Sequence, residues 1–378
     1  MAPAKTKLGS VAVIGGCGFL GHHIVRDLLA DPTVTRVSVM SRNPYRNRFS
    51  NKRVSYTPGD ITVPADVKSF LSDAKPNVII NTASPVAYID HIHAPSYEKV
   101  NVEGNATLLR YAQLLTTADA YIYTSSAPII AGPGGAYSQA DETYPTLAET
   151  CKDGDGDAYH IAKARGDALV LAANDASPGG MRTATIRPTA MYGEGDQQMI
   201  ANLLNVKRTG RQNVWLGNNT ALMDCVYVRS VARAHLLAAH ALLAGTVDPN
   251  APKVDGEAFN ITDDNPLPPW WFFRLFWIEM GDTTPLSEVW MVPNSVALAM
   301  AEVAEWWTWA TSFGKRRPKV LIKERIEFLL YTRTYSIKKA RERLGYKPVL
   351  DMSTAVRRAV EWALTEWPEE RGVSEKQD

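Results

Sequence analysis

The sequence carries almost no net charge and very little cysteine. Its 378 residues contain 41 Lys and Arg against 40 Asp and Glu, a formal net charge of +1, and the longest basic run is Lys315-Arg316-Arg317. Such a chain lacks the electrostatic footprint of a nucleic-acid-binding protein. The three cysteines, Cys17, Cys151 and Cys225, are widely spaced without a CxxC pair. We therefore predict neither a disulfide framework nor a metal site, and we expect a reducing compartment.

Long hydrophobic runs are also missing. No segment reaches the roughly 18 uninterrupted apolar residues of a membrane-spanning helix, and residues 1–9 lack the apolar centre of a secretory signal. A cytoplasmic protein is therefore expected. Hydrophobic residues nevertheless make up 45% of the chain, which is enough for a large core in one or two domains.

Short apolar segments alternate with amphipathic ones through the first half of the chain. We predict strands at 10–14, 34–40, 54–57, 77–80, 120–124 and 182–186, and helices at 19–30, 64–72, 97–115 and 159–173. This alternation is typical of an α/β fold with a doubly wound parallel sheet of the Rossmann type. Ligands of such folds bind at the carboxyl ends of the strands.

The pattern changes after Pro188. A loop at 193–196 leads to a helix that ends at Lys207, and beyond Pro266 the chain is rich in tryptophan. In between we predict an Ala-rich helix at 231–243 and a strand at 258–262. We interpret residues 1–190 as a dinucleotide-binding domain, to which segments near 222–262 return. The segments 191–221 and 263–378 are predicted to form a smaller, mostly helical lid that binds the substrate.

A glycine-rich turn, Gly15-Gly16-Cys17-Gly18-Phe19-Leu20-Gly21, separates the first predicted strand from the first predicted helix. Gly15 permits the tight turn, Gly18 lets the backbone approach a pyrophosphate, and Gly21 lets the helix pack closely on its strand. Phe19 and Leu20 open the helix, whose first N–H groups and dipole attract phosphate. The turn therefore predicts a nicotinamide dinucleotide site.

Residues after the next three strands would complete that site. Ser41-Arg42 stands where an NAD-preferring enzyme usually places a carboxylate, and a guanidinium attracts the 2′-phosphate of NADP. We predict NADP over NAD, while an ordinary loop arginine is the alternative interpretation of Arg42. Further contacts are predicted to the adenine, from Asp60 and Ile61, and along the phosphate–ribose path, from Thr82, Ala83 and Ser84.

Tyr159 and Lys163 lie one helical turn apart at the start of the helix predicted over 159–173. A tyrosine hydroxyl has an ordinary pKa of about 10, and a neighbouring ammonium favours its phenolate. Tyr159 is therefore predicted to exchange a proton with the substrate oxygen during hydride transfer, and Lys163 also to bind the nicotinamide ribose. Of the two serines that follow the fifth strand, Ser126 is preferred over Ser125 as a second group on that oxygen.

Five motifs in family order resemble the extended short-chain dehydrogenase/reductases: GGCGFLG, VNVEG (100–104), YTSS, YHIAK and RPTAMYGEGD. The segments DCVYVRSVARAHLLAAHAL, FNITDDNPLPPWWFFRLFW and TYSIKKARERLGYKP narrow the resemblance to the 3β-hydroxysteroid dehydrogenase branch, especially sterol-4α-carboxylate 3-dehydrogenases. The resemblance implies that Asn101 lies near the cofactor or its relay water and Pro188 beside the nicotinamide. It also implies catalytic roles for Tyr159, Lys163 and a YTSS serine.

The predicted reaction is the NAD(P)-dependent oxidation of a 3β-hydroxyl to a ketone on an apolar polycyclic substrate. A sterol, triterpenoid or meroterpenoid fits, with loss of a 4-carboxylate as CO2 where one is present. The acidic loop at 152–157 would repel such a carboxylate if it lined the pocket, which leaves a neutral terpenoid open, while an ordinary solvated loop is the alternative interpretation. Alternatives are ketone reduction at the same site and a nucleotide-sugar epimerase or dehydratase reaction. A cofactor-sensing regulatory protein is disfavoured because both Tyr159 and Lys163 are present.

An apolar substrate pocket is predicted, with Met191, Tyr192, Trp215 and residues of 268–277 as candidates that could instead pack in the core. The segments 270–280 and 296–313 are predicted to be aromatic, amphipathic helices. They would lie on a membrane surface, making the protein peripheral on the endoplasmic reticulum, or cover the pocket or a dimer contact. The resemblance also implies a homodimer paired through the helices at 97–115 and 159–173.

Overall fold

The computed structural model describes residues 6–86, 94–130, 135–151, 157–248, 250–313, 318 and 321–366. The basic run at 315–317 and residues 152–156 of the acidic loop lie outside these ranges, and their roles remain predictions. Among the described residues, no helix combines the length and the apolar content needed to span a bilayer.

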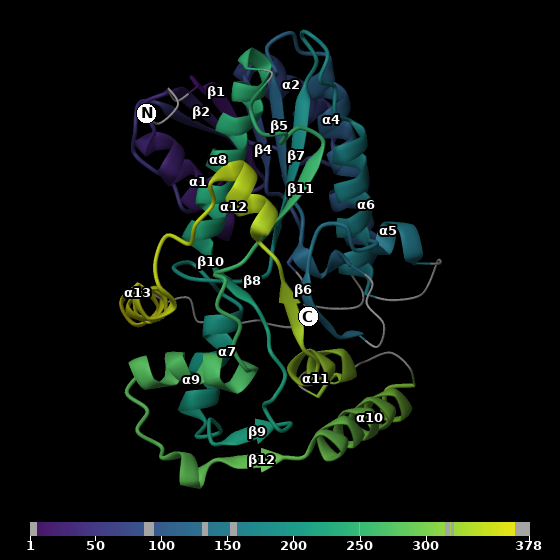
Figure 1. Ribbon diagram of the computed structural model, residues 1–378, viewed down its shortest axis with the longest axis vertical. Helices are drawn as coiled ribbons and strands as arrows, with labels where there is room; N and C mark the ends of the chain where they lie inside the picture. The colour runs from purple at the N-terminus through teal and green to yellow at the C-terminus, as the bar shows by residue number, and fades with distance from the viewer. Residues whose placement is uncertain are drawn as a thin grey trace.

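Seven parallel strands form the central sheet, in the order β11-β7-β5-β4-β1-β2-β3 (Figure 1). Their bounds are β1 (Gly9–Ile14), β2 (Val34–Ser41), β3 (Val54–Pro58), β4 (Val78–Asn81), β5 (Ala120–Thr124), β7 (Arg182–Pro188) and β11 (Glu257–Ile261). Every strand predicted in the first half is present, so the prediction of a doubly wound parallel sheet is confirmed. The strand predicted over 258–262 joins the sheet as β11, beside β7.

Helices cover both faces of the sheet because its inner strands are apolar on both sides. In β1, Val11 and Val13 belong to the core shared with α1 (Phe19–Ala30) and α8 (Val228–Val247). Ala12 and Ile14 belong to the core on the opposite face, shared with α2 (Pro64–Ala74) and α4 (Asn105–Gln113). α6 (Ala158–Ala172) packs beside α4. The period-two alternation of β1 thus assigns each residue to one layer.

The helix predicted over 97–115 is present, but it contains a π-helical turn that the sequence did not predict. Helical backbone runs without a break through α3 (Ala94–Glu98), a π-helical turn over Lys99–Gly104, and α4. Close packing accompanies the irregular turn, because a Cβ on Gly104 would lie only 2.7 Å from the Ile61 side chain. π-Helical turns are rare and frequently occur at functional sites. This one carries Asn101.

Figure 1 shows the central sheet in the upper part of the molecule and much of the second half of the chain in the lower part. It comprises α7 (Met199–Arg208), α9 (Pro269–Glu279), α10 (Asn294–Thr311), α11 (Lys323–Leu330) and the paired short strands β9 (Val214–Leu216) and β12 (Trp290–Val292). Two more parallel pairs lie between this end and the sheet. They are β8 (Ala190–Tyr192) with β10 (Cys225–Tyr227) and β6 (Tyr137–Ala140) with β13 (Arg333–Tyr335).

The last part of the chain is shared between the two ends. α12 (Lys338–Leu344) packs against α8 and β11, whereas α13 (Met352–Thr365) packs against α9 and α7. Further short helices are α5 (Leu147–Thr150) and 3-10 turns at Ala127–Ile129 and Leu286–Glu288. Part of the segment interpreted as lid therefore lies with the sheet.

Candidate active site

The glycine turn lies at the carboxyl end of β1, against the end of β4. Gly15 has a φ of +79°, and a Cβ on it would lie 2.8 Å from Thr82 Oγ1 and 3.1 Å from the Ala83 nitrogen. The Thr82 hydroxyl donates to the Ile14 carbonyl over 2.8 Å and so fixes this contact. Only glycine combines this backbone conformation with so close an approach. The carboxyl ends of β1 and β4 therefore lie in contact here, and the site between them is lined mainly by backbone atoms; we call it the glycine cradle.

The first turn of α1 faces the same cradle. A Cβ on Gly21 would lie 2.2 Å from the Gly15 carbonyl oxygen, which confirms the predicted close packing of the helix. Gly18 precedes α1, and no side chain caps the helix there. Phe19 is partly exposed and Leu20 is buried. Uncapped N–H groups and the helix dipole favour an anion, so the residues present fit the pyrophosphate of a dinucleotide.

The loop after β2 folds back over this turn. Asn47, at a φ of +50°, donates its side-chain amide to the Cys17 carbonyl over 3.0 Å. Burial raises the pKa of the Cys17 thiol, while a hydrogen bond with Ser41 and the charge of Arg48 oppose that rise. Ser41 and Arg48 therefore both lie close enough to the glycine turn to affect Cys17. Arg42 is exposed to solvent. Sequence reasoning missed Arg48, although the arginine-rich loop was a signal for it.

The other predicted cofactor contacts lie near the same sheet edge but differ in exposure. Asp60 accepts a backbone N–H from two residues further on, over 2.8 Å. Ile61 is buried and belongs to the core that contains α2 and α4. Ala83 and Ser84 are partly exposed after β4, and Pro188 ends β7 as a buried residue. The cofactor roles of these residues remain predictions.

Lys163 is almost completely buried in α6. It is 2% exposed, and its Nζ donates to the Thr124 carbonyl at the end of β5 over 2.8 Å. Burial lowers the pKa of Lys163 to about 7, an effect that the Asp167 carboxylate opposes. The structure does not show the predicted lowering of the Tyr159 pKa by Lys163. Instead burial raises the pKa of Tyr159, as do the ionised forms of Tyr97 and Asp157.

The two serines after β5 have different surroundings. The Ser126 side chain hydrogen-bonds with Tyr159, and this contact favours a lower pKa of Tyr159. The Ser125 N–H donates to the Ile186 carbonyl over 2.8 Å. The Ser125 hydroxyl is buried without a partner among the described residues. The geometry therefore associates Ser126, rather than Ser125, with the Tyr159 hydroxyl.

Asn101 presents an unusual buried amide. Its side chain is fully buried in the π-helical turn, and neither its oxygen nor its nitrogen has a partner in the described part of the chain. A Cβ on Gly166 of α6 would lie 2.4 Å from the Asn101 carbonyl oxygen, so the turn is pressed against the helix of Tyr159. Buried amides without partners are uncommon, and a bound water or ligand group would satisfy this one. The implied relay role of Asn101 remains a prediction.

Sequence reasoning missed two buried polar contacts beneath Lys163. Asp167 accepts from Arg187 in a bidentate ion pair at 2.5 and 3.2 Å, and both side chains are buried. Its position one turn after Lys163 was a usable signal. His235 Nε2 lies 2.8 Å from Thr124 Oγ1, although α8 brings it from 111 residues away. No local sequence pattern predicts a contact between residues so far apart in the chain.

The three predicted substrate contacts do not share one environment. Tyr192 is fully buried and donates its hydroxyl to Asp263 over 2.8 Å. Trp215 is also fully buried, with its ring stacked on Trp270 at a centroid distance of 6.1 Å. Met191 alone among the three is partly exposed. Tyr192 and Trp215 therefore fit the alternative prediction, in which these residues pack in the core, because aromatic side chains from α9 contact both of them.

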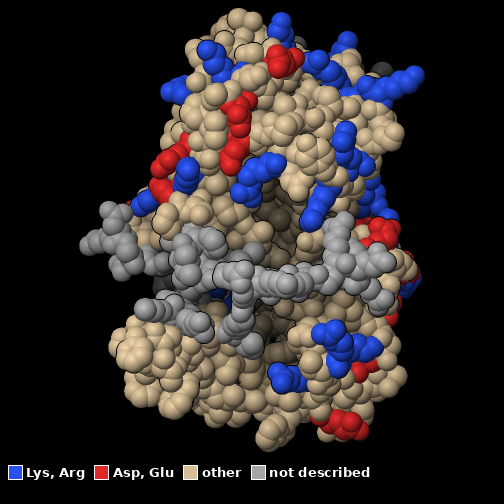
Figure 2. Space-filling model, turned by 180° about the vertical axis from the view of Figure 1, so that it is seen from behind, with Lys and Arg blue, Asp and Glu red and all other residues tan. Residues whose placement is uncertain are grey.

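The molecular surface is hollowed between the sheet and the end that carries α9 and α10 (Figure 2). Lys and Arg side chains border the upper side of this hollow in the same view. β7 runs towards the region between the two ends and continues into β8. Across the described ranges, no three His, Cys, Asp or Glu side chains gather as a metal site.

Known proteins match the chain along most of its length. Residues 12–293 match the 3-beta hydroxysteroid dehydrogenase/isomerase family. The chain belongs to this family. The decarboxylating sterol-4-alpha-carboxylate 3-dehydrogenase of Schizosaccharomyces pombe is 32% identical to it, over 95% of this chain and 98% of that protein. The Candida albicans protein of the same name is 32% identical, over 94% and 98%. A 3beta-hydroxysteroid-dehydrogenase/decarboxylase of Arabidopsis thaliana is 28% identical, over 92% and 78%.

Two solved structures with the same architecture are named as sugar-nucleotide enzymes. UDP-glucose 4-epimerase of Thermotoga maritima superposes with a TM-score of 0.69 at 19% identity, over 95% of this chain and 99% of that chain. The dTDP-glucose 4,6-dehydratase DesIV of Streptomyces venezuelae gives 0.69 at 20% identity, with the same coverage. At these identities the likeness concerns the fold alone.

Family membership confirms the predicted enzyme class. The protein is an oxidoreductase of the short-chain dehydrogenase/reductase type that acts on CH–OH groups with a nicotinamide dinucleotide. The glycine cradle, the uncapped start of α1 and the Tyr159–Ser126 contact are the features of this chain that suit such chemistry.

Proposed function

We propose that this enzyme oxidises the 3β-hydroxyl of a sterol or related terpenoid to the 3-ketone. One observation carries the proposal: relatives named sterol-4-alpha-carboxylate 3-dehydrogenases match the chain over nearly its whole length. The Ser126–Tyr159 contact with Lys163 one turn along supports it. A bound nicotinamide supplies the hydride acceptor for this reaction. The residues of the chain bind and orient the substrate and the cofactor, and they exchange the proton of the substrate hydroxyl.

Tyr159 is the residue that takes the proton from the substrate hydroxyl. Because burial raises its pKa, the phenol holds its own proton at neutral pH and must release it before acting as a base. The Ser126 hydrogen bond favours that release. The Lys163 amine, with its pKa near 7, exchanges protons readily at neutral pH. The serine and the phenol would hold the substrate oxygen between them.

The raised pKa of Tyr159 also favours a second candidate, reduction of a 3-ketone. A protonated phenol is ready to donate to a ketone oxygen as hydride arrives, and the same hydroxyls would hold that oxygen. Oxidation and reduction share one site and differ in which redox form of the cofactor is bound. Measuring initial rates in both directions at pH 7 separates them.

A substrate with a 4-carboxylate would also lose CO2. Oxidation at carbon 3 makes a β-keto acid, and the electrons of the breaking carbon–carbon bond then move into the carbonyl as an enolate. The Tyr159 and Ser126 hydroxyls would donate to the enolate oxygen, so no further catalytic group is needed. Protonation of the enolate carbon completes the ketone.

We propose NADP as the preferred cofactor, because the end of β2 offers a hydroxyl and arginines where a carboxylate would favour NAD. Ser41 and Arg48 act at the rim of the glycine turn, and Arg42 is exposed next to Ser41. Replacing Ser41 by Asp should move the NADP-to-NAD ratio of kcat/KM towards NAD by about tenfold or more. Arg46→Gln, in the same exposed loop, is the matched control. A strong NAD preference of the unaltered enzyme contradicts the proposal.

A substrate panel tests the function itself. Purified enzyme is offered 3-hydroxy and 3-keto sterols and terpenoids, with and without a 4-carboxylate, while cofactor absorbance and released CO2 are followed together. We expect turnover of at least one 3β-hydroxy compound, with CO2 only from the 4-carboxylates. Turnover of UDP-hexoses without any turnover of the panel would favour the epimerase or dehydratase alternative.

The residues of the substrate pocket and the oligomeric state of the protein are also proposals. Met191 is the one of the three substrate candidates with a partly exposed side chain, and we place it on the pocket wall. A homodimer through α4 and α6 would appear at twice the chain mass in sedimentation velocity. Cytoplasmic placement and the lack of nucleic-acid binding likewise remain predictions.

A further inference from the structure

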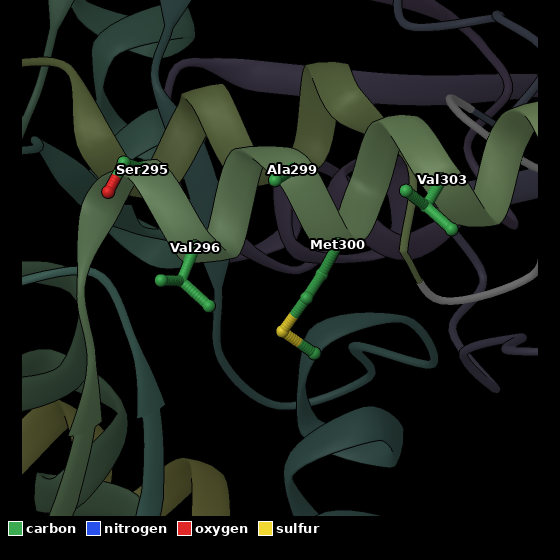
Figure 3. Close-up of a pocket in the computed structure, with 5 residues that line it drawn as sticks. All are labelled: Ser295, Val296, Ala299, Met300 and Val303. Carbon is green, nitrogen blue, oxygen red and sulfur yellow. The ribbon is translucent and has the colours of Figure 1, made fainter.

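His235 is a fully buried polar side chain on the inner face of α8. Its neighbours there are mostly small apolar residues, among them Ala234, Ala238 and Ala239, all fully buried. The hollow on α10 differs, because it is lined by side chains that do not titrate (Figure 3), namely Ser295, Val296, Ala299, Met300 and Val303. A titratable ring in a packed apolar layer loses its hydration, so it must find hydrogen-bond partners within the protein.

The contacts of the His235 ring fix its tautomer. Nδ1 lies 2.8 Å from the carbonyl oxygen of Val231, one turn earlier in α8, and a carbonyl can only accept. Nδ1 therefore carries the proton, and Nε2 accepts from the Thr124 hydroxyl over 2.8 Å. Burial lowers the pKa of His235 to about 4, so the ring is neutral and this bonding pattern holds at neutral pH.

This arrangement does not carry a proton to the site. The hydrogen bonds of His235 end at the Val231 carbonyl, which neither stores nor exchanges a proton near neutral pH. The ring therefore acts on its surroundings only through the place in which it holds Thr124.

Thr124 is held from both faces of the sheet. α8 belongs to the core on the face of α1, whereas α6 packs beside α4 on the opposite face. His235 binds the Thr124 hydroxyl from the first face, and Lys163 Nζ donates to the Thr124 carbonyl over 2.8 Å from the second. The residue that orients Thr124 thus also sets the position of the acceptor on which the Lys163 amine rests.

The same strand end leads directly to Ser126. The Ser125 N–H donates to the Ile186 carbonyl over 2.8 Å, so the backbone between Thr124 and Ser126 is tied to β7. The Ser126 side chain hydrogen-bonds with Tyr159. The acceptor for Lys163 and the serine at Tyr159 therefore belong to one short segment, and His235 is its side-chain anchor from α8.

We propose that His235 is a positioning residue of the active site, which holds Thr124 so that Lys163 and Ser126 keep their positions relative to Tyr159. The proposal rests on the proposed function for the roles of these three residues. It adds a group from α8, which contributes none of the predicted catalytic side chains. Small displacements of reacting groups lower rates strongly, so an anchor of this kind affects catalysis without touching the substrate.

Steady-state kinetics of His235→Leu test this role. The substrate is a 3β-hydroxysterol with a 4-carboxylate at saturating cofactor, and rates are normalised to the amount of folded, cofactor-binding protein. We expect kcat to fall about tenfold and the KM for the sterol to stay within about twofold, because the groups around Tyr159 move while the apolar pocket does not. His235→Gln should restore kcat to within about threefold, since its side-chain oxygen can accept from Thr124.

His240 provides a matched control on the same helix. Its Nδ1 lies 3.0 Å from the Thr6 carbonyl oxygen and its Nε2 2.9 Å from Asp31 Oδ2, so its bonding resembles that of His235 without involving a strand end at the site. His240→Leu should lower stability and leave kcat unchanged.

Thr124→Val removes the same hydrogen bond from the other side and serves if His235→Leu does not fold. It should lower kcat as much as His235→Leu does. The double variant His235→Leu/Thr124→Val should lose no more than either single variant, because all three lack one and the same contact.

The position of Lys163 can also be followed without turnover. Competitive labelling of amines with acetic anhydride is read by mass spectrometry of the peptide that contains Lys163. Labelling should be about threefold faster or more in His235→Leu and Thr124→Val, because an ammonium that loses a fixed acceptor is deprotonated more often. His240→Leu should label like the unaltered protein.

Equal kcat losses in His235→Leu and His240→Leu, failure of His235→Gln to restore kcat, or additive losses in the double variant would each overturn the assignment. Unchanged labelling of Lys163 would do the same. If the unaltered enzyme does not turn over the sterol, the proposed function is contradicted, and the labelling still decides the role of His235. If Tyr159→Phe is inactive while His235→Leu keeps full activity, only the positioning role fails.

Discussion

Helix α1 in the sheet half and helix α10 at the other end of the molecule orient their large apolar side chains in opposite ways. In the sheet half, Leu28 of α1 and Ile24 beside it are fully buried, and polar groups such as Lys163 lie at strand ends in fixed contacts. At the other end, alanines are buried in α10 while Met300 and Trp307 face outward. Apolar composition is similar in both places. The difference teaches that exposure, rather than hydrophobicity, separates a core from an interaction surface.

The largest effect is expected at the polar centre of the sheet half. Tyr159→Phe removes the only proton that its side chain can exchange, so kcat should fall by about 10²–10⁴-fold. The dissociation constant of the cofactor should stay within about twofold, because the cradle is built from backbone. Tyr111→Phe, on α4, serves as the control and should leave kcat unchanged. Comparable kcat values for Tyr159→Phe and the unaltered enzyme would exclude the proton-transfer role.

Buried and exposed ion pairs provide the next contrast. Asp167→Asn leaves the buried Arg187 guanidinium without its counter-charge and should lower the free energy of unfolding by about 3–5 kcal/mol. Glu302→Gln breaks the exposed pair with Lys323 and should cost under about 1 kcal/mol. Urea unfolding at pH 7 measures both. Equal costs would mean that the two ends are not as different in burial as the structure shows.

Truncation of matched apolar side chains tests the comparison directly. Leu28→Ala empties a packed site and should lower the free energy of unfolding by about 2–5 kcal/mol. Met300→Ala acts on a side chain that already faces solvent, so the change should stay within about 0.5 kcal/mol. A large loss for Met300→Ala in the absence of lipid would show that α10 packs against something in solution.

A smaller effect than the loss from Leu28→Ala is expected in the pH dependence of stability of the cofactor-free protein. The pKa of Lys163 falls from its ordinary 10.5 to about 7 in the fold, so between these values the unfolded chain binds more protons. Stability from this group is therefore lost as pH falls towards 7 and gained as pH rises. Between pH 7.5 and 8.5 the unaltered protein should gain about 1 kcal/mol relative to Lys163→Met. Parallel pH profiles of the two proteins would contradict the buried amine.

Local patterns were enough to predict the sheet and the positions of the key motifs. The spacing of Gly15, Gly18 and Gly21 encodes the turn and the close helix, because Gly15 has a positive φ and the other two glycines both pack against its carbonyl oxygen. Tyr159 and Lys163 share a helix face for the same local reason. The π-helical turn within the helix predicted over 97–115 was not predictable in this way, since it packs against Ile61 and Gly166, which are far away in sequence.

The sequence alone determined the fold class, the cofactor cradle and the family, because these depend on the spacing of residues within single elements. Only the tertiary structure decided that Ser126, not Ser125, meets Tyr159, and that Trp215 is buried while Trp307 is exposed. Two neighbouring serines or two tryptophans have the same chemistry wherever they occur. What distinguishes them is which distant segment packs against each, and that depends on long-range contacts that no local pattern carries.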